Sequence, residues 1–260
     1  MSPDLYICVL MVLLGLAIGS FLNVLIYRLP REKKTILSRS ACPHCGHVIP
    51  MYLNIPLISF VILLGRCRYC RDRISWRYPL VESLNAGLYL LFFYRDSLTP
   101  QLAVHAVLSS ALIVIFFIDL EFQIIPDQIT LPGIVLGLLV GLFIKPPGIM
   151  GALIGLAVGG GALLGVAYLG EWLFKKEAMG GGDVKMAAMM GAFVGWQKVL
   201  LIFMGGAVIG MIASIVWMAV SERIRKERLI PFGPFLAVAS VAALAYGDEI
   251  VQYYIRHLLR

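Results

Sequence analysis

The chain has 260 residues, of which 60% are hydrophobic and 14% are charged, whereas a soluble domain carries about 25% charged residues. This composition excludes an ordinary soluble protein, and the continuous rather than alternating apolar runs exclude a transmembrane β-barrel. The net charge is +7, but basic residues do not interleave with aromatic ones, so we expect no nucleic-acid partner. The sequence predicts an all-α polytopic membrane protein embedded in lipid.

Apolar runs recur along the chain and predict about eight transmembrane helices. The first, residues 5–27, has no basic segment before it and no small-residue cleavage site after it, so we interpret it as a retained span. The sixth is too short for a full crossing, which suggests a tilt or a start inside the preceding Gly-rich segment. The predicted spans are 5–27, 79–94, 101–118, 129–144, 149–170, 185–196, 199–220 and 232–246.

Lys and Arg residues are distributed unevenly between the predicted loops. If the first loop is cytoplasmic, 17 of the 22 lie in the cytoplasmic segments 28–78, 119–128, 171–185 and 221–231, and five lie outside. Cytoplasmic loops of membrane proteins carry this excess, so both termini are predicted to lie outside. The same assignment places Asp119 and Asp183 on the cytoplasmic side. Nothing in the sequence indicates an oligomeric state.

Residues 28–78 form a sizeable cytoplasmic insertion in what we otherwise interpret as one integral membrane domain over 1–260. Within the insertion, residues 51–65 are apolar but are interrupted by Asn54 and Pro56. The run is short for a span, and a crossing here would place the arginines on its two sides on opposite faces of the membrane. We therefore predict an interfacial or buried hairpin.

Two Cys-x-x-Cys pairs lie in this insertion, with 21 residues between them. Each pair can place two thiolates on one tight turn, and two such turns supply the four sulfur ligands of a tetrahedral zinc ion. Because four protein ligands leave no open coordination position, we expect a structural zinc site that helps a short loop to fold. The predicted ligands are Cys42, Cys45, Cys67 and Cys70.

Other interpretations of these cysteines remain open. Two disulfides are disfavoured by the reducing cytosol, and a redox-active pair is disfavoured because the pair is duplicated. His44 or His47 can serve as an alternative ligand, although we favour bystander roles for both. Cys8 lies in the first span and is interpreted as a small buried apolar residue.

Asp119 directly continues the apolar run 111–118 without a polar spacer. A carboxylate at the edge of a bilayer is expensive to keep there and is a candidate functional residue. Two more acids follow it, and we favour ordinary roles for them. Glu121 is expected to face solvent, and Asp127 is expected to cap the helix that begins after Pro126.

Asp183 follows three glycines and precedes Lys185 by two residues. The segment lacks the spacing and the Lys-Ser/Thr pair of a phosphate-binding loop, and an isolated Gly-x-Gly-Asp is usually a flexible turn. Gly180 and Gly182 permit close backbone approach, and Lys185 is the only nearby cation. Since Asp119 lies on the same side of the membrane, we predict a catalytic dyad that shares one proton and activates water.

The order and combination of several motifs resembles the type 4 prepilin peptidases (leader peptidase/N-methyltransferases) over nearly the whole chain. The motifs are residues 19–24, 27–30, both cysteine pairs, 77–79 with Glu82, 118–119, 125–127, the Gly-x-Gly-Asp segment 180–183 followed by Val184 and Lys185, and 231–235.

This resemblance implies an aspartic endopeptidase of the Gly-x-Gly-Asp type in the bacterial inner membrane, with Asp119 and Asp183 as its catalytic pair. Such enzymes cleave the basic leader of prepilins and pseudopilins after a glycine at the cytoplasmic face. Many then methylate the new N-terminal amine with S-adenosylmethionine, and the zinc-binding first loop is associated with these bifunctional members. Glu82, Glu121 and Asp127 are candidate contacts for the basic leader, but Glu82 is equally well a helix-packing or ion-pair residue that faces the basic loop. Residues that bind the methyl donor are not indicated.

Two other functional classes compete with this interpretation. A proton-coupled transporter is expected to carry acids nearer the bilayer midplane and often an inverted repeat, neither of which the sequence shows. The small residues Gly151, Gly155 and Gly159 predict close helix packing in either case. A zinc scaffold that docks other membrane proteins explains the four cysteines but leaves the paired aspartates without a role.

Overall fold

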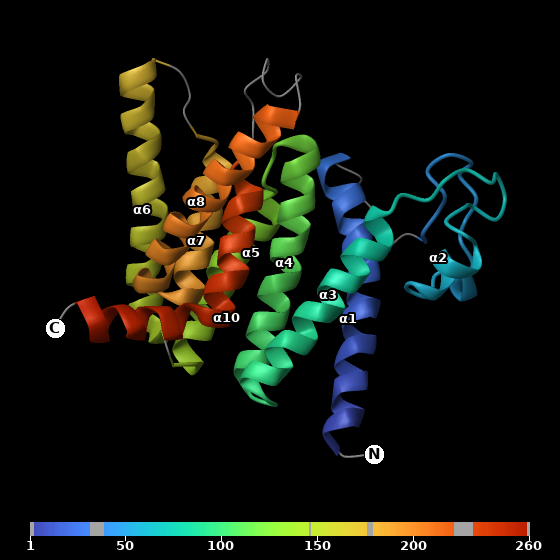
Figure 1. The fold of residues 1–260 in the computed structure, drawn as a ribbon, viewed down its shortest axis with the longest axis horizontal. Coiled ribbons are helices and arrows are strands. Elements are labelled where there is room, and N and C mark those ends of the chain that lie inside the picture. The colour runs from blue at the N-terminus through green and yellow to red at the C-terminus, as the bar shows by residue number, and fades with distance from the viewer. Residues whose placement is uncertain (1–2, 32–38, 146, 176–178, 221–230, 259–260) are drawn as a thin grey trace. The chain divides into compact units, whose positions relative to one another are not determined.

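The computed structural model describes residues 3–31, 39–145, 147–175, 179–220 and 231–258, and eight long helices dominate this part of the chain (Figure 1). Strands are absent from the described residues, which contain two isolated β-bridges. The long helices are α1 (Pro3–Arg28), α3 (Arg77–Asp96), α4 (Pro100–Phe122), α5 (Asp127–Phe143), α6 (Gly148–Phe174), α7 (Gly181–Val194), α8 (Trp196–Val220) and α10 (Gly233–Leu258), and the short ones are η1 (Leu29–Arg31), η2 (Met51–Leu53) and α2 (Ile58–Ile62).

Each of the eight predicted spans coincides with one of the long helices. By length and composition, five helices of the described chain can cross a membrane, namely α1, α4, α6, α8 and α10, while α5 is a shorter apolar helix. The all-helical membrane class is therefore confirmed, with five candidate spans. The predicted cytoplasmic loop 221–231 lies outside the described residues except for Pro231.

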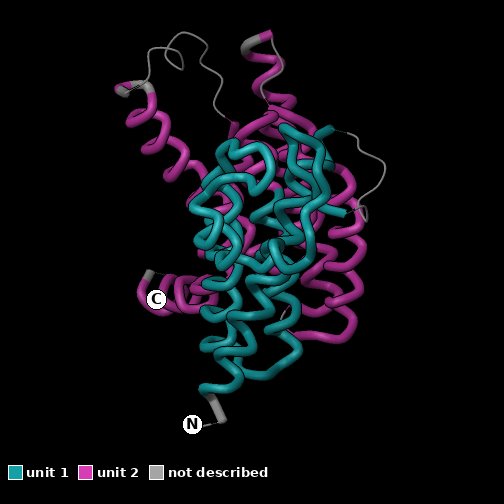
Figure 2. Tube along the Cα trace, turned by 90° about the vertical axis from the view of Figure 1, so that its right-hand side faces the viewer, with its two compact units in different colours: residues 1–114 teal, residues 115–260 magenta. Residues whose placement is uncertain are grey.

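Two compact units make up the chain, residues 1–114 and 115–260, and the boundary falls within α4 (Figure 2). In the first unit α1 packs closely along α3. A Cβ atom on Gly15 would lie 2.6 Å from the Cα atom of Ala86, and one on Gly19 would lie 2.7 Å from the Cα atom of Glu82. Glycine at both positions allows the two helix backbones to approach one another, as small residues do in membrane helix pairs.

A buried polar network also joins the helices of the first unit. Asn85 donates a hydrogen bond to the Gly15 carbonyl oxygen over 2.8 Å, and its own Oδ1 accepts one from the Ser110 hydroxyl over 2.8 Å. The Tyr89 hydroxyl lies 3.1 Å from the same serine oxygen. Because lipid offers no hydrogen-bond partners, such polar side chains must be satisfied within the protein.

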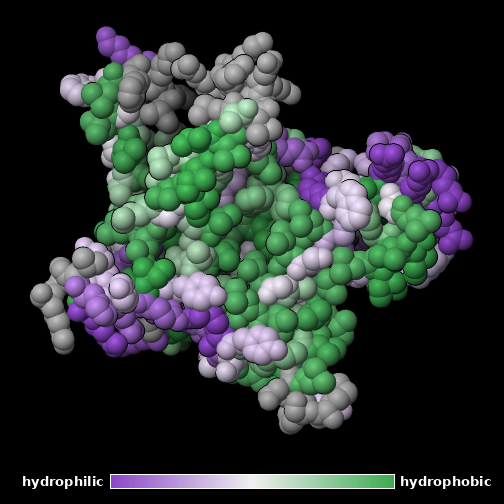
Figure 3. All heavy atoms as spheres, viewed as in Figure 1, coloured by the Kyte–Doolittle hydropathy of each residue, from purple (hydrophilic) through white to green (hydrophobic). Residues whose placement is uncertain are grey.

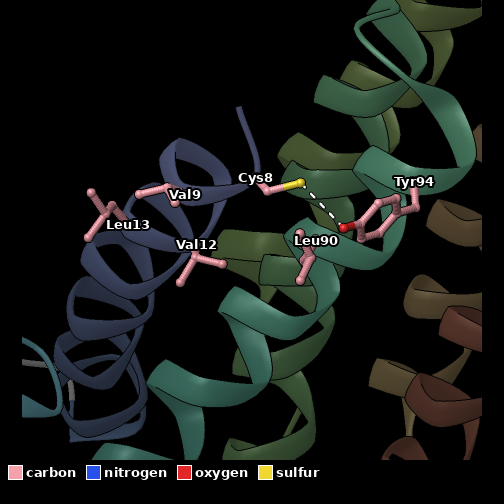
Figure 4. Close-up of a pocket in the computed structure, with 6 residues that line it drawn as sticks. All are labelled: Cys8, Val9, Val12, Leu13, Leu90 and Tyr94. Atoms are coloured by element: carbon pink, nitrogen blue, oxygen red, sulfur yellow. Dashed lines mark hydrogen bonds between the residues drawn. The ribbon is translucent and has the colours of Figure 1, made fainter. Parts of the chain in front are cut away.

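A small apolar cavity of about 210 Å³ lies between α1 and α3 and is lined by Cys8, Val9, Val12, Leu13, Leu90 and Tyr94 (Figure 4). Cys8 is only partly buried, and its thiol donates to the Tyr94 hydroxyl oxygen over 3.4 Å. The prediction that Cys8 is a small buried apolar residue therefore holds only in part. The reason is that the first unit leaves this face of α1 uncovered.

In the second unit α7 is the central helix and packs against α5, α6 and α8. Its residues from Met186 to Ala192 are all buried. A Cβ atom on Gly155 would overlap the carbonyl of Gly191, and one on Gly191 would overlap that of Gly155. The predicted packing role is thus confirmed for Gly155, and it fixes α7 tightly against α6.

Helix α10 continues twelve residues beyond the predicted end of the last span, to Leu258. Figure 1 shows its final part, ending at the C-terminus, running across the direction of its first part. Lys198 at the start of α8 forms a 2.7 Å ion pair with Asp248 in α10. Residues 247–258 are thus a continuation of α10 rather than a separate element.

Candidate active site

Four helix ends of the second unit meet around the two predicted catalytic aspartates. Asp119 lies in the last turn of α4, and Asp183 lies in the first turn of α7. Ile125, in the link between α4 and α5, lies against the start of α7 and the start of α10. A Cβ atom on Gly182 would lie 2.9 Å from its Cβ atom, and one on Gly233 would lie 3.1 Å from its Cδ1 atom. Segments far apart in sequence thus form one cluster.

Asp119 is 5% exposed and faces the N-terminus of α10. Its carboxylate accepts a hydrogen bond from the backbone N–H of Gly233, the first residue of that helix. A Cβ atom on Gly233 would lie 2.5 Å from Oδ2 of Asp119, so a larger residue at this position would displace the carboxylate. Free N–H groups at a helix N-terminus favour a negative charge, so this contact offsets part of the cost of burying a carboxylate at position 119.

Gly233 is a candidate site residue that sequence reasoning missed. It belongs to the quoted motif 231–235, but no role was assigned to it. The sequence does indicate a helix start at this position, because Gly233-Pro234 opens an apolar run and proline is favoured in the first turn of a helix. That signal predicts a helix start, although it does not reveal which acid the helix start contacts.

The Gly-x-Gly-Asp spacing has a local structural reason. Gly180 is the N-cap of α7, and Asp183 is the third helical residue after it. The Asp183 carboxylate accepts a hydrogen bond from the Gly180 N–H, which is the reciprocal contact of a capping box. The other carboxylate oxygen, Oδ1, is buried and has no hydrogen-bond partner among the described residues. One oxygen therefore fixes the side chain, and the other is available for a reacting group.

Burial and the neighbouring negative charge of Asp119 raise the pKa of Asp183 to about 6, against a lowering effect of the Gly180 N–H. Asp183 precedes the predicted sixth span. Both causes penalise the ionised carboxylate, by loss of hydration and by like-charge repulsion. The negative charge of Asp119 thus acts on Asp183, as expected for two acids that belong to one site.

Replacing Gly182 by alanine is expected to lower catalytic activity about tenfold or more, because the added methyl group collides with Ile125 and displacement of a catalytic group by about 1 Å can cost roughly 100-fold. Gly181→Ala is the matched control, since nothing lies within 4 Å of its Cβ position. Steady-state kinetics of the two variants provide the measurement. Equal activities of the two would contradict the packing role of Gly182.

Lys185 does not neutralise the dyad. Its Nζ lies 2.8 and 2.7 Å from the two carboxylate oxygens of Asp127, at the start of α5. Asp127 is the first residue of α5, whereas Pro126 occupies the N-cap, so the predicted capping by Asp127 was wrong. An exposed pair of this kind contributes little stability, about 1 kcal/mol or less. It does join the starts of α5 and α7 beside the site.

The other acids suggested for leader binding differ in exposure. Glu82 is 6% exposed, and its Oε2 accepts a 2.9 Å hydrogen bond from the Leu57 backbone N–H. Glu121 is exposed, as predicted. Glu82 therefore holds the insertion against α3, and of the three acids Glu121 and Asp127 remain on the surface.

The four predicted zinc ligands come together in the first unit. Their sulfur atoms all lie within 4.8 Å of one another, and those of Cys42 and Cys70 are 3.9 Å apart. Four sulfurs bound at about 2.3 Å to one tetrahedral ion lie about 3.8 Å apart. All four cysteines are free thiols, so the alternative of two disulfides does not apply to this structure. The cluster can hold a metal ion.

Both cysteine turns have the same backbone construction. Isolated antiparallel bridges join Ala41 to Val48 and Arg66 to Arg73. Within each turn the first cysteine accepts a hydrogen bond from the residue four positions later, over 2.9 Å at Gly46 and 3.0 Å at Arg71. Those two residues have φ angles of 71° and 61°. The repeated turn positions two thiolates from each pair toward one centre.

Fold and site together define a helical membrane protein with a buried carboxylate pair at converging helix ends and a separate four-cysteine cluster. Comparison with known families gives two matches, one to the bacterial peptidase A24 N-terminal domain over residues 13–95 and one to the type IV leader peptidase family over residues 106–215. The chain belongs to the type IV leader peptidase family. The N-terminal match contains the cysteine cluster, and the second match contains both aspartates.

Characterised relatives cover nearly the whole chain. Proteins from Pseudomonas putida and Aeromonas hydrophila are 36% and 37% identical to it, over 94% and 99% of this chain and 92% and 96% of their own lengths. A protein from Pseudomonas aeruginosa is 35% identical over 94% of this chain and 92% of its own length. All three are named prepilin leader peptidase/N-methyltransferase. No solved structure matches the chain.

Proposed function

We propose that this protein is a membrane aspartic endopeptidase that removes the basic leader of type IV prepilins or pseudopilins after a glycine at the cytoplasmic face. We propose further that it methylates the new N-terminal amine with S-adenosylmethionine. The names of its near-full-length relatives support both activities. The observation that carries the peptidase assignment is the convergence of α4, α7 and α10 around Asp119 and Asp183.

Hydrolysis by this pair requires one proton shared between two carboxylates. The ionised aspartate removes a proton from water, whose oxygen attacks the scissile carbonyl carbon, while the protonated aspartate donates a hydrogen bond to the carbonyl oxygen. Collapse of the tetrahedral intermediate breaks the C–N bond, and the amine leaves with a proton from the pair. The buried, unpartnered Oδ1 of Asp183 is the oxygen best placed for this exchange.

The second reaction starts from the amine that the first releases. Its nitrogen lone pair attacks the methyl carbon of the sulfonium donor, the S–CH₃ bond breaks, and the amine loses a proton. The amine must be deprotonated before it attacks, so this step depends on a neutral N-terminus. The family match to the N-terminal domain supports this activity, and we assign no donor-binding residue.

For the membrane arrangement, we propose that all eight long helices cross or enter the bacterial inner membrane as a single functional domain over 1–260. The charge bias of the loops supports cytoplasmic placement of the aspartates and of the insertion 28–78, with both termini outside. The helices α3, α5 and α7 are not among the candidate spans, so they need neighbouring helices to pack against within the membrane. Helix α7 packs against α5, α6 and α8.

We also propose a structural zinc ion held by Cys42, Cys45, Cys67 and Cys70. The chemistry of four thiolates and their spacing fit such an ion. The insertion that carries them contains two short helices, of three and five residues, and few buried apolar side chains. A metal centre therefore supplies the stability that its small core lacks.

The proposed function is tested by incubating the purified protein in lipid nanodiscs with a matched prepilin and analysing the product by mass spectrometry. Leader removal is expected without a cofactor, and a gain of one methyl group is expected only when S-adenosylmethionine is added. Leader removal without methylation under both conditions would refute the second activity. An intact prepilin would refute the first and would favour the scaffold interpretation if zinc is present.

The rate of leader cleavage is expected to fall as pH rises above about 6. With the pKa of Asp183 at about 6, higher pH leaves both carboxylates ionised and removes the proton that polarises the carbonyl. The pH dependence of kcat/KM reports the free enzyme and is the measurement to use. Asp127→Asn is the control, because Asp127 is paired with Lys185 and its loss should leave the profile in place. A rate that increases up to pH 9 would contradict the shared-proton dyad.

Removal of a single cluster cysteine is expected to release the metal. Elemental analysis of the purified protein should give one zinc ion per chain, and Cys42→Ser should reduce this to near zero because a structural tetrahedral site needs all four ligands. Cys8→Ser is the matched control, since Cys8 lies in α1 outside the cluster. Wild-type protein without zinc and with freely reactive thiols would contradict the site.

A further inference from the structure

The insertion exposes an unusual amount of apolar surface for a segment outside the membrane helices. The run from η2 through α2 and on to Leu64 carries large apolar side chains that are exposed. Their exposed fractions are 82% for Met51, 68% for Val61, 70% for Ile62 and 85% for Leu64, and nearby Trp76 is 76% exposed. Exposed apolar patches of this kind mark an interaction surface.

The depth of this apolar run can be read from its contacts within the first unit. The Leu57 N–H is hydrogen-bonded to Glu82, which in turn interacts with the Ser20 side chain. Glu82 lies five residues into α3 and Ser20 lies eight residues before the end of α1. At 1.5 Å per residue these positions are roughly 8 Å and 12 Å inside the helix ends. The backbone at Leu57 thus lies beside the last third of α1, which is a candidate membrane span.

Positively charged side chains border this apolar run. Four exposed arginines, Arg66, Arg68, Arg71 and Arg73, follow it directly on the second cysteine turn. Figure 3 shows hydrophobic atoms on the lower part of the insertion and hydrophilic atoms along its upper and outer margin, at the right of the view. Segments that lie in a membrane interface combine a buried apolar face with a Lys/Arg-rich polar face that attracts anionic lipid.

We propose that residues 51–65 form a membrane-inserting hairpin that dips into the cytoplasmic leaflet, with the arginines of the second cysteine turn contacting anionic phospholipid headgroups. The occupant of this surface is lipid, because the hairpin is held at the depth of a membrane span and its apolar side is bordered by positive charge. The four-cysteine cluster then lies at the headgroup level. The proposal does not depend on the peptidase activity.

Site-specific photocrosslinking in vesicles tests the proposal. A benzophenone amino acid is introduced at Ile62 or Leu64 in the full chain, which is reconstituted in phosphatidylethanolamine/phosphatidylglycerol vesicles and irradiated. Position Pro43, exposed on the first cysteine turn, is the control. Mass spectrometry should find phospholipid attached at 62 and 64 at least fivefold more often than at 43.

Other outcomes are equally informative. Crosslinks at 62 and 64 to a second copy of the chain, or to prepilin when it is added, would overturn the proposal and assign the surface to a protein partner. Crosslinking no higher than at position 43 would also overturn it. In the same vesicles, a double variant, Arg66→Gln with Arg73→Gln, should lose the preference for phosphatidylglycerol over phosphatidylethanolamine while keeping acyl-chain crosslinks at 62. An unchanged preference would refute the headgroup contact.

Discussion

Asp119→Asn and Asp183→Asn are each expected to reduce leader cleavage by about 10⁴-fold or more. Removal of a member of a catalytic unit usually costs this much. Asparagine preserves the shape of the side chain, and its Oδ1 can still accept the hydrogen bond from Gly233 or from Gly180. The change therefore removes the ionisable group while keeping the contacts that hold the helix ends together.

Asp127→Asn is the matched control for both variants. It alters a carboxylate in the same part of the second unit, but one that is about half exposed and paired with Lys185. Its activity should remain within a few-fold of the wild type. Thermal unfolding in detergent should be similar for all three variants. Wild-type cleavage by either dyad variant, with its stability unchanged, would refute the catalytic assignment.

Gly191→Ala is expected to destabilise the second unit by about 3 kcal/mol, at the upper end of the range for overpacked positions. The reason is that its new methyl group would overlap the Gly155 carbonyl, which belongs to the rigid backbone of α6. Helices α6 and α7 must then separate. Because α7 carries Asp183, cleavage activity should fall together with stability.

Gly161→Ala on α6 is the control, since nothing lies within 4 Å of its Cβ position. Alanine is a better helix former than glycine by about 1 kcal/mol, so this variant should be unchanged or slightly more stable in detergent unfolding. If both alanine variants unfold alike, the close contact between α6 and α7 does not control stability.

Helix positions were predictable from the sequence because apolar runs of this length have few alternatives in lipid. The ends were less predictable. Helix α7 begins at Gly181 because Gly180 serves as its N-cap, and α10 continues to Leu258 beyond the apolar part of its sequence. Both differences depend on capping and tertiary contacts, which hydropathy does not report.

For the site, the sequence indicated the cysteine cluster and the pair of aspartates but not their surroundings. The cysteine spacing alone specified the ligand set that the structure brings together. Gly233 contacts Asp119, and Ile125 packs against Gly182 and Gly233. These contacts join segments that are more than 50 residues apart in sequence. Such contacts become visible only once the helix ends are placed. For the same reason Lys185 seemed to be a neighbour of Asp183, although its partner is Asp127.

Ile125 gives the site a property that is not evident from its charges. This aliphatic side chain lies against Gly182 and Gly233, so it occupies the space between the start of α7 and the start of α10. Apolar packing therefore contributes to the separation of the two acids, which no salt bridge joins in the described residues. Ionic strength should leave that separation nearly unchanged, whereas heat or a loosely packing detergent should disturb it early, before the helices themselves unfold.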